Sequence, residues 1–246
     1  MQNNTENDIL QLPEKIAIEK GIQIVICIDE FQQISDFEDS KTFQKKLRSV
    51  WQLQQHVSYC LFGSKKHLMN ELFEKKNLPF YKFGDAIYLA KIETKYWIEY
   101  ICKRFENTGK HISPELAEEI CRLVDNHSSY VQQLSWLLWI RTINTATTEQ
   151  LSYALEDLLD QNNILFQSET ENLSAYQMNF LKAIVDGIHT KFSSKEVISK
   201  YNLGTSANIV RLKNALLQKE LIETNGKEIV LADPVFEVWF KKEMLY

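Results

Sequence analysis

The feature that most constrains this chain is a run of seven almost wholly apolar residues, 22–28, that leads directly into Asp29 and Glu30. A short, continuously apolar run is typical of a strand buried on both faces of a parallel sheet. Ligands bind beyond the carboxyl ends of the strands in such a sheet, so we expect the two carboxylates to face a ligand crevice. The chain is therefore predicted to contain an α/β unit with a polar site at the end of this strand.

Two more apolar runs, residues 56–62 and 86–92, are predicted to be strands of the same sheet. Segments with helical periodicity separate the three runs, and alternation of strand and helix at this spacing is typical of a parallel sheet. Gly63 and Ser64 follow the second run, so a hydroxyl is expected at the same edge of the sheet as the two carboxylates. From this pattern, residues 1–92 are predicted to form an α/β domain.

The pattern then becomes purely helical, and residues 93–166 are predicted to form an all-α bundle. A Ser-Pro-Glu sequence at residues 113–115 supplies a cap, a first-turn proline and a first-turn acid, which mark the start of a helix. Residues 130–143 are apolar nearly all round, as expected of a helix at the centre of a bundle. The tryptophans and tyrosines of residues 96–100 and 130–139 are accordingly expected in the core.

The last part of the chain, residues 167–246, is predicted to be a winged helix domain. A helix is followed by a short helix that opens on a capping box of Ser193 and Glu196, and then by a longer helix capped by Ser206. Two short strands joined by an Asn-Gly turn at residues 225–226 come next. Helices followed by a hairpin in this order are typical of a winged helix.

The composition excludes several classes of protein. With 44% hydrophobic and 25% charged residues the chain is predicted to be globular, and its net charge of −5 favours neither nucleic acid nor an anionic membrane as a general partner. No apolar stretch approaches the length of a membrane span, and the polar, acidic N-terminus does not resemble a secretory signal. We expect a cytoplasmic protein with buried, reduced cysteines at Cys27, Cys60, Cys102 and Cys121.

Asp29 and Glu30 are the strongest candidates for chemistry. Hydrolysis of a nucleoside triphosphate requires Mg²⁺ on the phosphate oxygens and a residue that orients the attacking water. An aspartate at the end of a buried strand can hold the ion, and the adjacent glutamate can act as general base. The alternative is structural: Asp29 caps the following turn and Glu30 is solvated.

Two further residues are weaker candidates. Ser64 could contact the γ-phosphate or the water, but it is also a good N-cap for the next helix. Lys82 lies in an aromatic loop, residues 79–84, where it could stabilise developing charge or be an ordinary surface lysine. The five histidines lack the spacing of metal ligands and are interpreted as ordinary surface or partly buried residues: His56, His67, His111, His127 and His189.

The predicted winged helix is locally basic. Residues 191–227 contain seven basic and three acidic side chains, a net charge of +4. The longer helix carries Arg211 and Lys213 and could enter the major groove of duplex DNA, although only Asn208 in its first half is suited to base edges. Winged helices also pack against proteins, so a protein partner remains the alternative.

Taken in order, these signals resemble the archaeal-type ATPases of the STAND/AAA+ branch of P-loop NTPases. The resemblance covers residue 8 to the end and is carried by IVICIDEFQQI (24–34), the segment 59–92 that begins YCLFGSKKHLMN, NHSSYVQQLSWLLW (126–139), LSAYQMNFLKAIVDG (173–187) and DPVFEVWFKK (233–242). It implies a partial P-loop NTPase sheet with the Walker B strand, a helical lid and a winged helix, with ATP and Mg²⁺ as cofactors. It also implies that Asp29 binds the metal, Glu30 is catalytic and Ser64 senses phosphate.

The chain departs from this family in three places. It contains no phosphate-binding G-x-x-x-x-G-K-[ST] loop, which in the family would precede Met1 together with the first strand. Lys82 stands where the family usually has arginine, which would offer a bidentate fork. A His-Ser-Ser sequence at residues 127–129 replaces a Gly-x-Pro-like turn. The resemblance therefore implies the C-terminal part of an ATPase that is inactive alone.

Three interpretations of function remain open from the sequence. The chain is part of an ATPase that hydrolyses ATP to switch conformation, or a non-enzymatic winged-helix adaptor or DNA-binding regulator with a degenerate ATPase domain, or an inert fragment. Salt-dependent binding to duplex DNA that is lost in Arg211→Ala and Lys213→Ala would favour the second interpretation.

Overall fold

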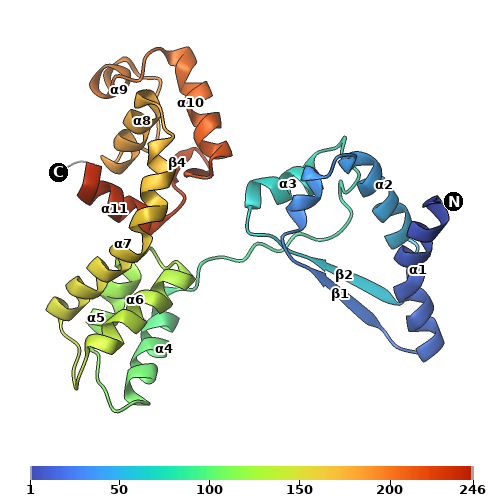
Figure 1. Cartoon of the computed structure of the whole chain (residues 1–246), viewed down its shortest axis with the longest axis horizontal. Coiled ribbons are helices and arrows are strands. Elements are labelled where there is room, and N and C mark those ends of the chain that lie inside the picture. Colours follow the sequence, from blue (N-terminus) through green and yellow to red (C-terminus); the bar gives the residue numbers. More distant parts are fainter. Residues whose placement is uncertain (1, 245–246) are drawn as a thin grey trace. The chain divides into compact units, whose positions relative to one another are not determined.

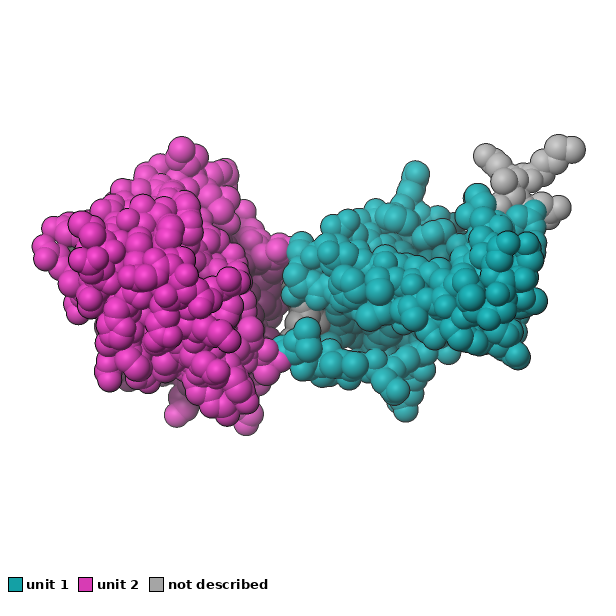
Figure 2. All heavy atoms as spheres, turned by 90° about the horizontal axis from the view of Figure 1, so that it is seen from below, with its two compact units in different colours: residues 1–89 teal, residues 90–246 magenta. Residues whose placement is uncertain are grey.

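The structure is a computed structural model that describes residues 2–244, and the chain forms two compact units, Met1–Leu89 and Ala90–Tyr246 (Figure 2). Unit 1 contains helices and a small sheet, whereas unit 2 consists of helices and one hairpin (Figure 1). No helix in the described part of the chain is both long enough and apolar enough to cross a membrane.

Unit 1 is an α/β unit built on two parallel strands. Its elements are, in order, α1 (Gln2–Lys20), β1 (Ile24–Ile28), the 3₁₀ helix η1 (Phe31–Asp36), α2 (Ser40–Trp51), β2 (Val57–Leu61) and α3 (Lys66–Glu74). The strands pair in parallel from Ile24 opposite Val57 to Ile28 opposite Leu61. This pairing confirms the predicted parallel α/β arrangement for the two strands. The segment between them contains the helix α2, and a parallel pair requires a crossover of this kind.

The third predicted strand, residues 86–92, is wrong. Residues 85–93 have no regular secondary structure, and the side chains of Ile87 and Leu89 are 85% and 93% exposed. Within residues 2–244 the sheet that contains β1 holds only β1 and β2. A strand needs a neighbour that supplies backbone hydrogen bonds, and among residues 2–244 no strand pairs with this segment.

The expectation that β1 is buried on both faces is also wrong. Its residues alternate between half-buried and exposed, and Val25 is 65% exposed. The half-buried side packs on a small core formed by Phe31, Ile34, Leu47, Trp51, Leu72 and Phe80. These residues come mainly from η1, α2 and α3, which lie over one face of the sheet (Figure 1).

Unit 2 begins with a helical bundle. Its helices are α4 (Thr94–Glu106), α5 (Pro114–Leu123), α6 (Ser128–Arg141) and α7 (Thr148–Glu171). The predicted cap of α5 is confirmed, because the side chain of Ser113 accepts a hydrogen bond from the Leu116 N–H at 3.2 Å. A capping box of Thr147 and Gln150 opens α7, which continues beyond the expected end at residue 166.

Aromatic residues of the bundle are only partly buried as expected. Trp97 and Tyr130 lie in the core, but Tyr96, Tyr100 and Trp136 are 54%, 42% and 56% exposed, so the expectation is wrong for these three residues. The inner side of α6 packs Val131, Leu134 and Leu138, and its other side faces solvent. An apolar sequence all round the helix therefore does not place it at the centre of the bundle.

The C-terminal elements form the predicted winged helix. They are α8 (Ala175–Val185), α9 (Lys195–Tyr201), α10 (Ser206–Gln218), β3 (Ile222–Asn225), β4 (Glu228–Leu231) and α11 (Pro234–Met244). The antiparallel hairpin turns at Gly226, whose φ of 62° suits glycine. Two predicted caps are each one residue off, since Ser194 caps α9 in place of Ser193 and Thr205 precedes α10 in place of Ser206.

The core of unit 2 is continuous. Buried apolar residues run without interruption from Trp97 in α4 to Phe240 in α11, through the bundle and the winged helix alike. Phe166 of α7 packs against Phe236 and Trp239 of α11, with ring centroids 5.3 and 5.6 Å apart. The division of this part of the chain into domains 93–166 and 167–246 stays a prediction.

Candidate functional site at the strand ends of unit 1

The carboxyl ends of β1 and β2 lie side by side, so the residues that follow the two strands are close to one another. The Phe31 N–H donates to the Phe62 carbonyl, and the Phe62 N–H donates to the Ile28 carbonyl, both at 3.0 Å. These bonds continue the ladder past the two strands and fix the turns that follow them. Ser64 Oγ consequently donates to Glu30 Oε1 at 3.0 Å, with Oε2 at 3.2 Å.

The backbone at the end of β1 has an unusual conformation. Glu30 is left-handed, with φ 50° and ψ 39°, which is uncommon for a residue other than glycine, asparagine or aspartate and occurs often at functional sites. Its N–H donates to Asp29 Oδ1 at 2.8 Å. Asp29 is exposed and Glu30 is half-buried. The two adjacent carboxylates therefore differ in surroundings: Asp29 faces solvent, while Glu30 is held against β2.

The sequence reasoning missed one member of this site, Gln32. Its side chain is only 2% exposed, and its Nε2 donates to Glu30 Oε2, whereas its Oε1 is buried without a hydrogen-bond partner. A Cβ atom on Gly63 would lie 1.9 Å from that Oε1, so the amide occupies space that only glycine leaves open. The Gly63-Ser64 pair after a strand was the available signal, because it marks a close approach between backbone and side chain.

The alternative role of Ser64 as a helix cap is not observed. Helix α3 begins at Lys66, with Lys65 at the N-cap position, and Ser64 instead donates to Glu30. The structural alternative for Asp29 is partly observed, since its carboxylate accepts the N–H of the next residue. The hydrogen bond to Oδ1 leaves the exposed carboxylate of Asp29 able to bind a ligand from solvent.

Lys82 is not part of this cluster. The Lys82 ammonium group lies 5.6 Å from the centroid of the Tyr81 ring, and the backbone N–H of Lys82 donates to the Phe73 carbonyl at 3.1 Å. Among the described residues it forms no hydrogen bond or ion pair with Glu30. The loop is anchored from α2 by Arg48, which donates to the carbonyl of Tyr81 at 3.1 Å and lies over the Phe83 ring.

The donor set fits a hard cation but does not complete a site for one. Mg²⁺ prefers oxygen ligands and is commonly held by one or two protein carboxylates together with water and substrate phosphates. Asp29 offers such a carboxylate in solvent. Within the described part of the chain, no group of three histidine, cysteine, aspartate or glutamate side chains is arranged to hold a metal ion. A metal here would therefore depend on ligands from the substrate.

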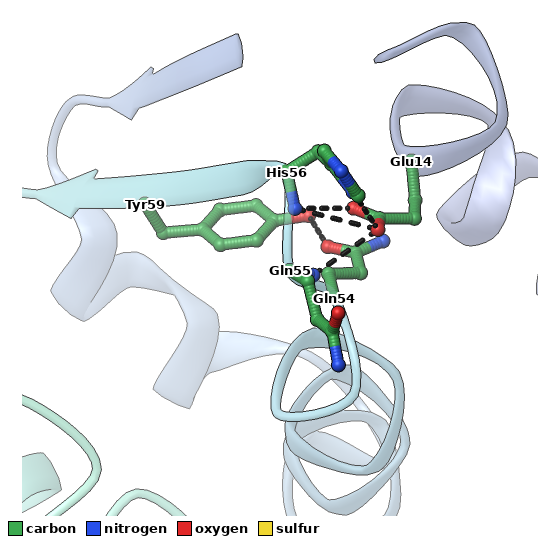
Figure 3. A network of polar contacts seen from close by, with 5 residues as sticks. All are labelled: Glu14, Gln54, Gln55, His56 and Tyr59. Atoms are coloured by element: carbon green, nitrogen blue, oxygen red, sulfur yellow. Dashed lines mark hydrogen bonds and ion pairs between the residues drawn. The ribbon is translucent and has the colours of Figure 1, made fainter. Parts of the chain in front are cut away.

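The start of β2 is fastened to α1 by a polar network (Figure 3). The Glu14 carboxylate accepts hydrogen bonds from the backbone N–H groups of Gln55 at 3.1 Å and His56 at 3.0 Å. The ring atom Nδ1 of His56 lies 2.9 Å from Oε1 of Glu14. Gln54 Nε2 donates to the Leu10 carbonyl at 2.9 Å. The hydrogen bond from His56, together with the two backbone N–H groups, lowers the pKa of Glu14. This network positions the strand that presents Ser64.

The expectation of ordinary surroundings suits His56 and His189 but not His127, whose Nδ1 is buried without a hydrogen-bond partner among the described residues. His56 belongs to the network with Glu14, and the ring of His189 hydrogen-bonds the Ile229 carbonyl at 3.1 Å. The His127 ring lies 4.7 Å from that of Tyr130. The side chain of His67 lies outside the described part of the chain.

The winged helix presents the second predicted site. Arg211 is exposed on α10 and donates to Asn208 Oδ1 at 2.8 Å, while Asn208 Nδ2 donates to the Leu203 carbonyl at 3.0 Å. Lys213 is partly buried. A shallow pocket of about 420 Å³ opens at the start of α10 and is lined by Tyr176, Gly204, Thr205, Ala207, Asn208 and Arg211. A larger apolar pocket of about 520 Å³, between α4 and α6, contains none of the predicted site residues.

Comparison with known proteins bears on both units. A family model described as "probable winged helix domain" matches residues 164–242. A search of curated protein sequences gave no match. Among solved structures, the chain is similar to a Walker-type ATPase of Pyrococcus abyssi, with a TM-score of 0.73 and 17% sequence identity over 96% of this chain and 67% of that one.

Two further structures score lower. RuvB of Thermotoga maritima, a Holliday junction branch migration motor, gives a TM-score of 0.43 at 13% identity over 90% of this chain and 70% of that one. The Orc1 protein of Aeropyrum pernix, solved in complex with DNA, gives 0.43 at 11% identity over 89% and 64%. At these values the first structure alone supports a shared fold. The chain thus shares the fold of the Walker-type ATPase of Pyrococcus abyssi, in line with the resemblance found in the sequence, and its C-terminal part matches a winged helix domain.

Proposed function

We propose that unit 1 carries the magnesium and water-activating side of an ATP-hydrolysing site of the STAND/AAA+ type, with β1 as its Walker B strand. The observation that carries the proposal is the position of Glu30, whose carboxylate accepts hydrogen bonds from Ser64 and Gln32 at the carboxyl ends of two neighbouring parallel strands. Ligands of open parallel sheets bind at this edge. Hydrolysis would drive a change of conformation in the helical part and the winged helix.

Each residue has a distinct role in this proposal. Asp29 would hold the metal from its exposed position, and Mg²⁺, when bound, would neutralise charge on the phosphate oxygens. Glu30 would orient a water molecule and accept its proton, since an ionised carboxylate is an acceptor only. Ser64 and Gln32 would hold the carboxylate in one orientation. Lys82 would stabilise developing charge from the loop of residues 79–84.

Nucleotide affinity tests one part of the proposal. The 246 residues contain no G-x-x-x-x-G-K-[ST] loop, and such a loop supplies the backbone N–H groups and lysine that hold the β- and γ-phosphates. We therefore propose that this chain alone binds Mg-ATP weakly and is inactive alone. A calorimetric titration of the chain with Mg-ATP is expected to show no binding in the micromolar range, and micromolar affinity would overturn this part.

The catalytic assignment requires the site in a form that binds nucleotide. Reading the DNA upstream of the Met1 codon for an in-frame phosphate-binding loop shows whether such a form is encoded. In a protein that carries the loop, Glu30→Gln is expected to lower ATP hydrolysis by about 10²–10⁴-fold while Mg-ATP binding is retained. Asp29→Asn is expected to weaken the metal dependence of binding. Wild-type turnover in Glu30→Gln would exclude Glu30 as the base.

A second function is favoured by the winged helix. Arg211 lies exposed on α10 beside a pocket at the start of that helix, in a segment of net charge +4, so α10 could contact duplex DNA in a non-enzymatic adaptor or regulator. Arg211→Ala and Lys213→Ala are each expected to lower duplex affinity and to reduce the salt dependence by about one phosphate contact. Lys241→Ala on α11 serves as the control. Salt-independent or absent binding would instead favour a protein partner.

A further inference from the structure

Two cysteines of unit 1 are direct neighbours across the sheet. Cys27 of β1 and Cys60 of β2 are register partners in the parallel ladder. Adjacent strands of a sheet lie about 4.8 Å apart. This spacing falls within the range of about 4.4–6.8 Å that separates the two Cα atoms of a disulfide. The ladder therefore already holds the two Cα atoms at a separation that a disulfide accepts.

Both thiols point to the same open face of the sheet. The sequence neighbours of the two cysteines pack against the core of unit 1: Ile28 beside Cys27, and Tyr59 and Leu61 on either side of Cys60. Side chains alternate between the faces of a strand, so Cys27 and Cys60 share the other face, and both are exposed free thiols. A reagent can consequently reach the pair without any opening of the core.

The cysteines of unit 2 lie in different surroundings. Cys121 is fully buried in the core, and burial raises its pKa to about 11. Cys102 is partly buried, burial likewise raises its pKa, and its thiol lies 3.8 Å from the Ile112 carbonyl. Because the thiolate is the nucleophile, these two residues are protected internal controls within the same chain.

We propose that Cys27 and Cys60 form a redox-modifiable dithiol site whose co-reactant is a small-molecule disulfide. A pair of thiols is too few for a structural zinc site, which takes four protein ligands. The pair has the geometry for thiol–disulfide exchange, because the second thiol lies next to the first and can attack the mixed disulfide that the first one forms. This proposal is independent of the one made for ATP hydrolysis.

The exchange balances in two steps. The thiolate of one cysteine attacks a sulfur of the small disulfide, which forms a mixed disulfide and releases one small thiolate that takes up a proton. The thiolate of the second cysteine then attacks the protein sulfur of that mixed disulfide, forms the Cys27–Cys60 bond and releases the second small thiol. Two electrons pass from the protein thiols to the reagent, and no other oxidant is needed.

Peptide mapping tests the proposal on the folded 246-residue chain. After incubation with glutathione disulfide, the remaining thiols are alkylated in denaturant and the chain is digested with trypsin. We expect a species that joins the peptide of residues 21–41 to that of residues 49–65, while Cys102 and Cys121 are recovered alkylated. The cross-linked species should disappear when a reductant is added before alkylation.

Single variants decide between a pair and two independent thiols. In Cys27→Ser and in Cys60→Ser the remaining cysteine is expected to keep glutathione as a mixed disulfide, because no neighbour resolves it. A urea-unfolded sample of the unsubstituted chain should lose the preference for this pairing. Stable mixed disulfides on both cysteines of the folded chain, cross-links between two chains only, or modification no faster than that of Cys121 would each overturn the proposal.

Discussion

The two units differ most in how much apolar surface each one buries. Unit 1 has a small core, half of whose buried residues are aromatic, and it leaves Val25 65%, Leu53 76% and Ile87 85% exposed. Unit 2 has a continuous core that extends through the bundle and the winged helix. Stability grows with the apolar surface removed from water, so unit 1 is expected to be the less stable unit. The candidate catalytic residues thus lie in the unit that is expected to be less stable.

The largest expected effect comes from the centre of the core of unit 1. Phe80 is fully buried, and its ring centroid lies 5.4 Å from those of both Phe31 and Phe83. Phe80→Ala is expected to cost about 3–5 kcal/mol, which approaches the whole stability of a small domain. Urea unfolding followed by the fluorescence of Trp51, the only tryptophan in residues 1–89, should show unit 1 unfolded before unit 2.

The matched control for that variant is Phe236→Ala in unit 2. Phe236 is 1% exposed and packs against several aromatic rings, so the local cost should be similar. Because the core of unit 2 is larger, that variant should shift the transition of unit 2 without abolishing its fold. If Phe80→Ala unfolds at the same urea concentration as the unsubstituted chain, the proposed difference between the units is incorrect.

A second effect concerns the contact beneath the candidate site. Gly63→Ala would place a Cβ atom 1.9 Å from Gln32 Oε1, and the buried amide has to move to accept it. We expect a loss of about 1–3 kcal/mol from overpacking. The double variant Gly63→Ala with Gln32→Ala should recover much of this loss in a double-mutant cycle. Gly84→Ala is the control, since no atom lies within 4 Å of a Cβ atom built there.

A smaller effect tests whether unit 2 unfolds as one body. Tyr130 in α6 donates a hydrogen bond to Asp233 Oδ2 at 2.5 Å, which joins the bundle to the start of α11. Tyr130→Phe is expected to cost about 1 kcal/mol and to leave a single unfolding transition, because the core is continuous. Circular dichroism during urea unfolding measures both. A separate early transition of residues 167–246 would instead support three domains.

The smallest effect is a difference in the response to acid. The pKa of Glu14 in unit 1 is lowered, chiefly by His56, so its stabilising contribution is complete above the ordinary carboxyl pKa and is lost as the pH falls through the lowered value. The pKa of Glu169 in unit 2 is raised, chiefly by burial and also by Asp233. A raised pKa has the opposite sign: unit 2 loses stability as the pH rises through the raised value.

Two variants separate these contributions. Glu14→Gln should reduce the acid sensitivity of unit 1 and lower its stability at neutral pH, and Glu169→Gln should raise the stability of unit 2 at neutral pH. Hydrogen exchange measured at pH values between 4 and 7, a window around the ordinary carboxyl pKa, reports each unit separately. Equal pH profiles for both units would contradict the assignment.

Much of the local structure was predictable from the chain. The cap at Ser113 and the hairpin turn act through hydrogen bonds and backbone angles within a few residues, so short motifs predict them, although the turn lies at residues 226–227, one residue later than expected. The winged helix followed from such signals in order. The placement of Asp29, Glu30 and Ser64 at the ends of neighbouring strands was also expected, because parallel strands share an edge.

The errors have a common cause. Residues 86–92 have the composition of a strand but no partner, and β1 is apolar without a second covering layer. The same open face explains why Cys27 and Cys60 are exposed, contrary to expectation. Gln32 was overlooked because its role depends on Gly63, which approaches it only after the strands pair.

The amino-acid sequence by itself determined most of the helices and strands, although not the absence of a strand at residues 86–92, and it determined that two carboxylates and a serine follow neighbouring strands. Only the tertiary structure decided that Glu30 is held between Gln32 and Ser64, that Lys82 stays apart from them, and that one face of the sheet presents two thiols. The physical reason is range. Backbone preferences act between near neighbours in sequence, whereas burial, pairing and close approach depend on segments that meet only in the folded chain.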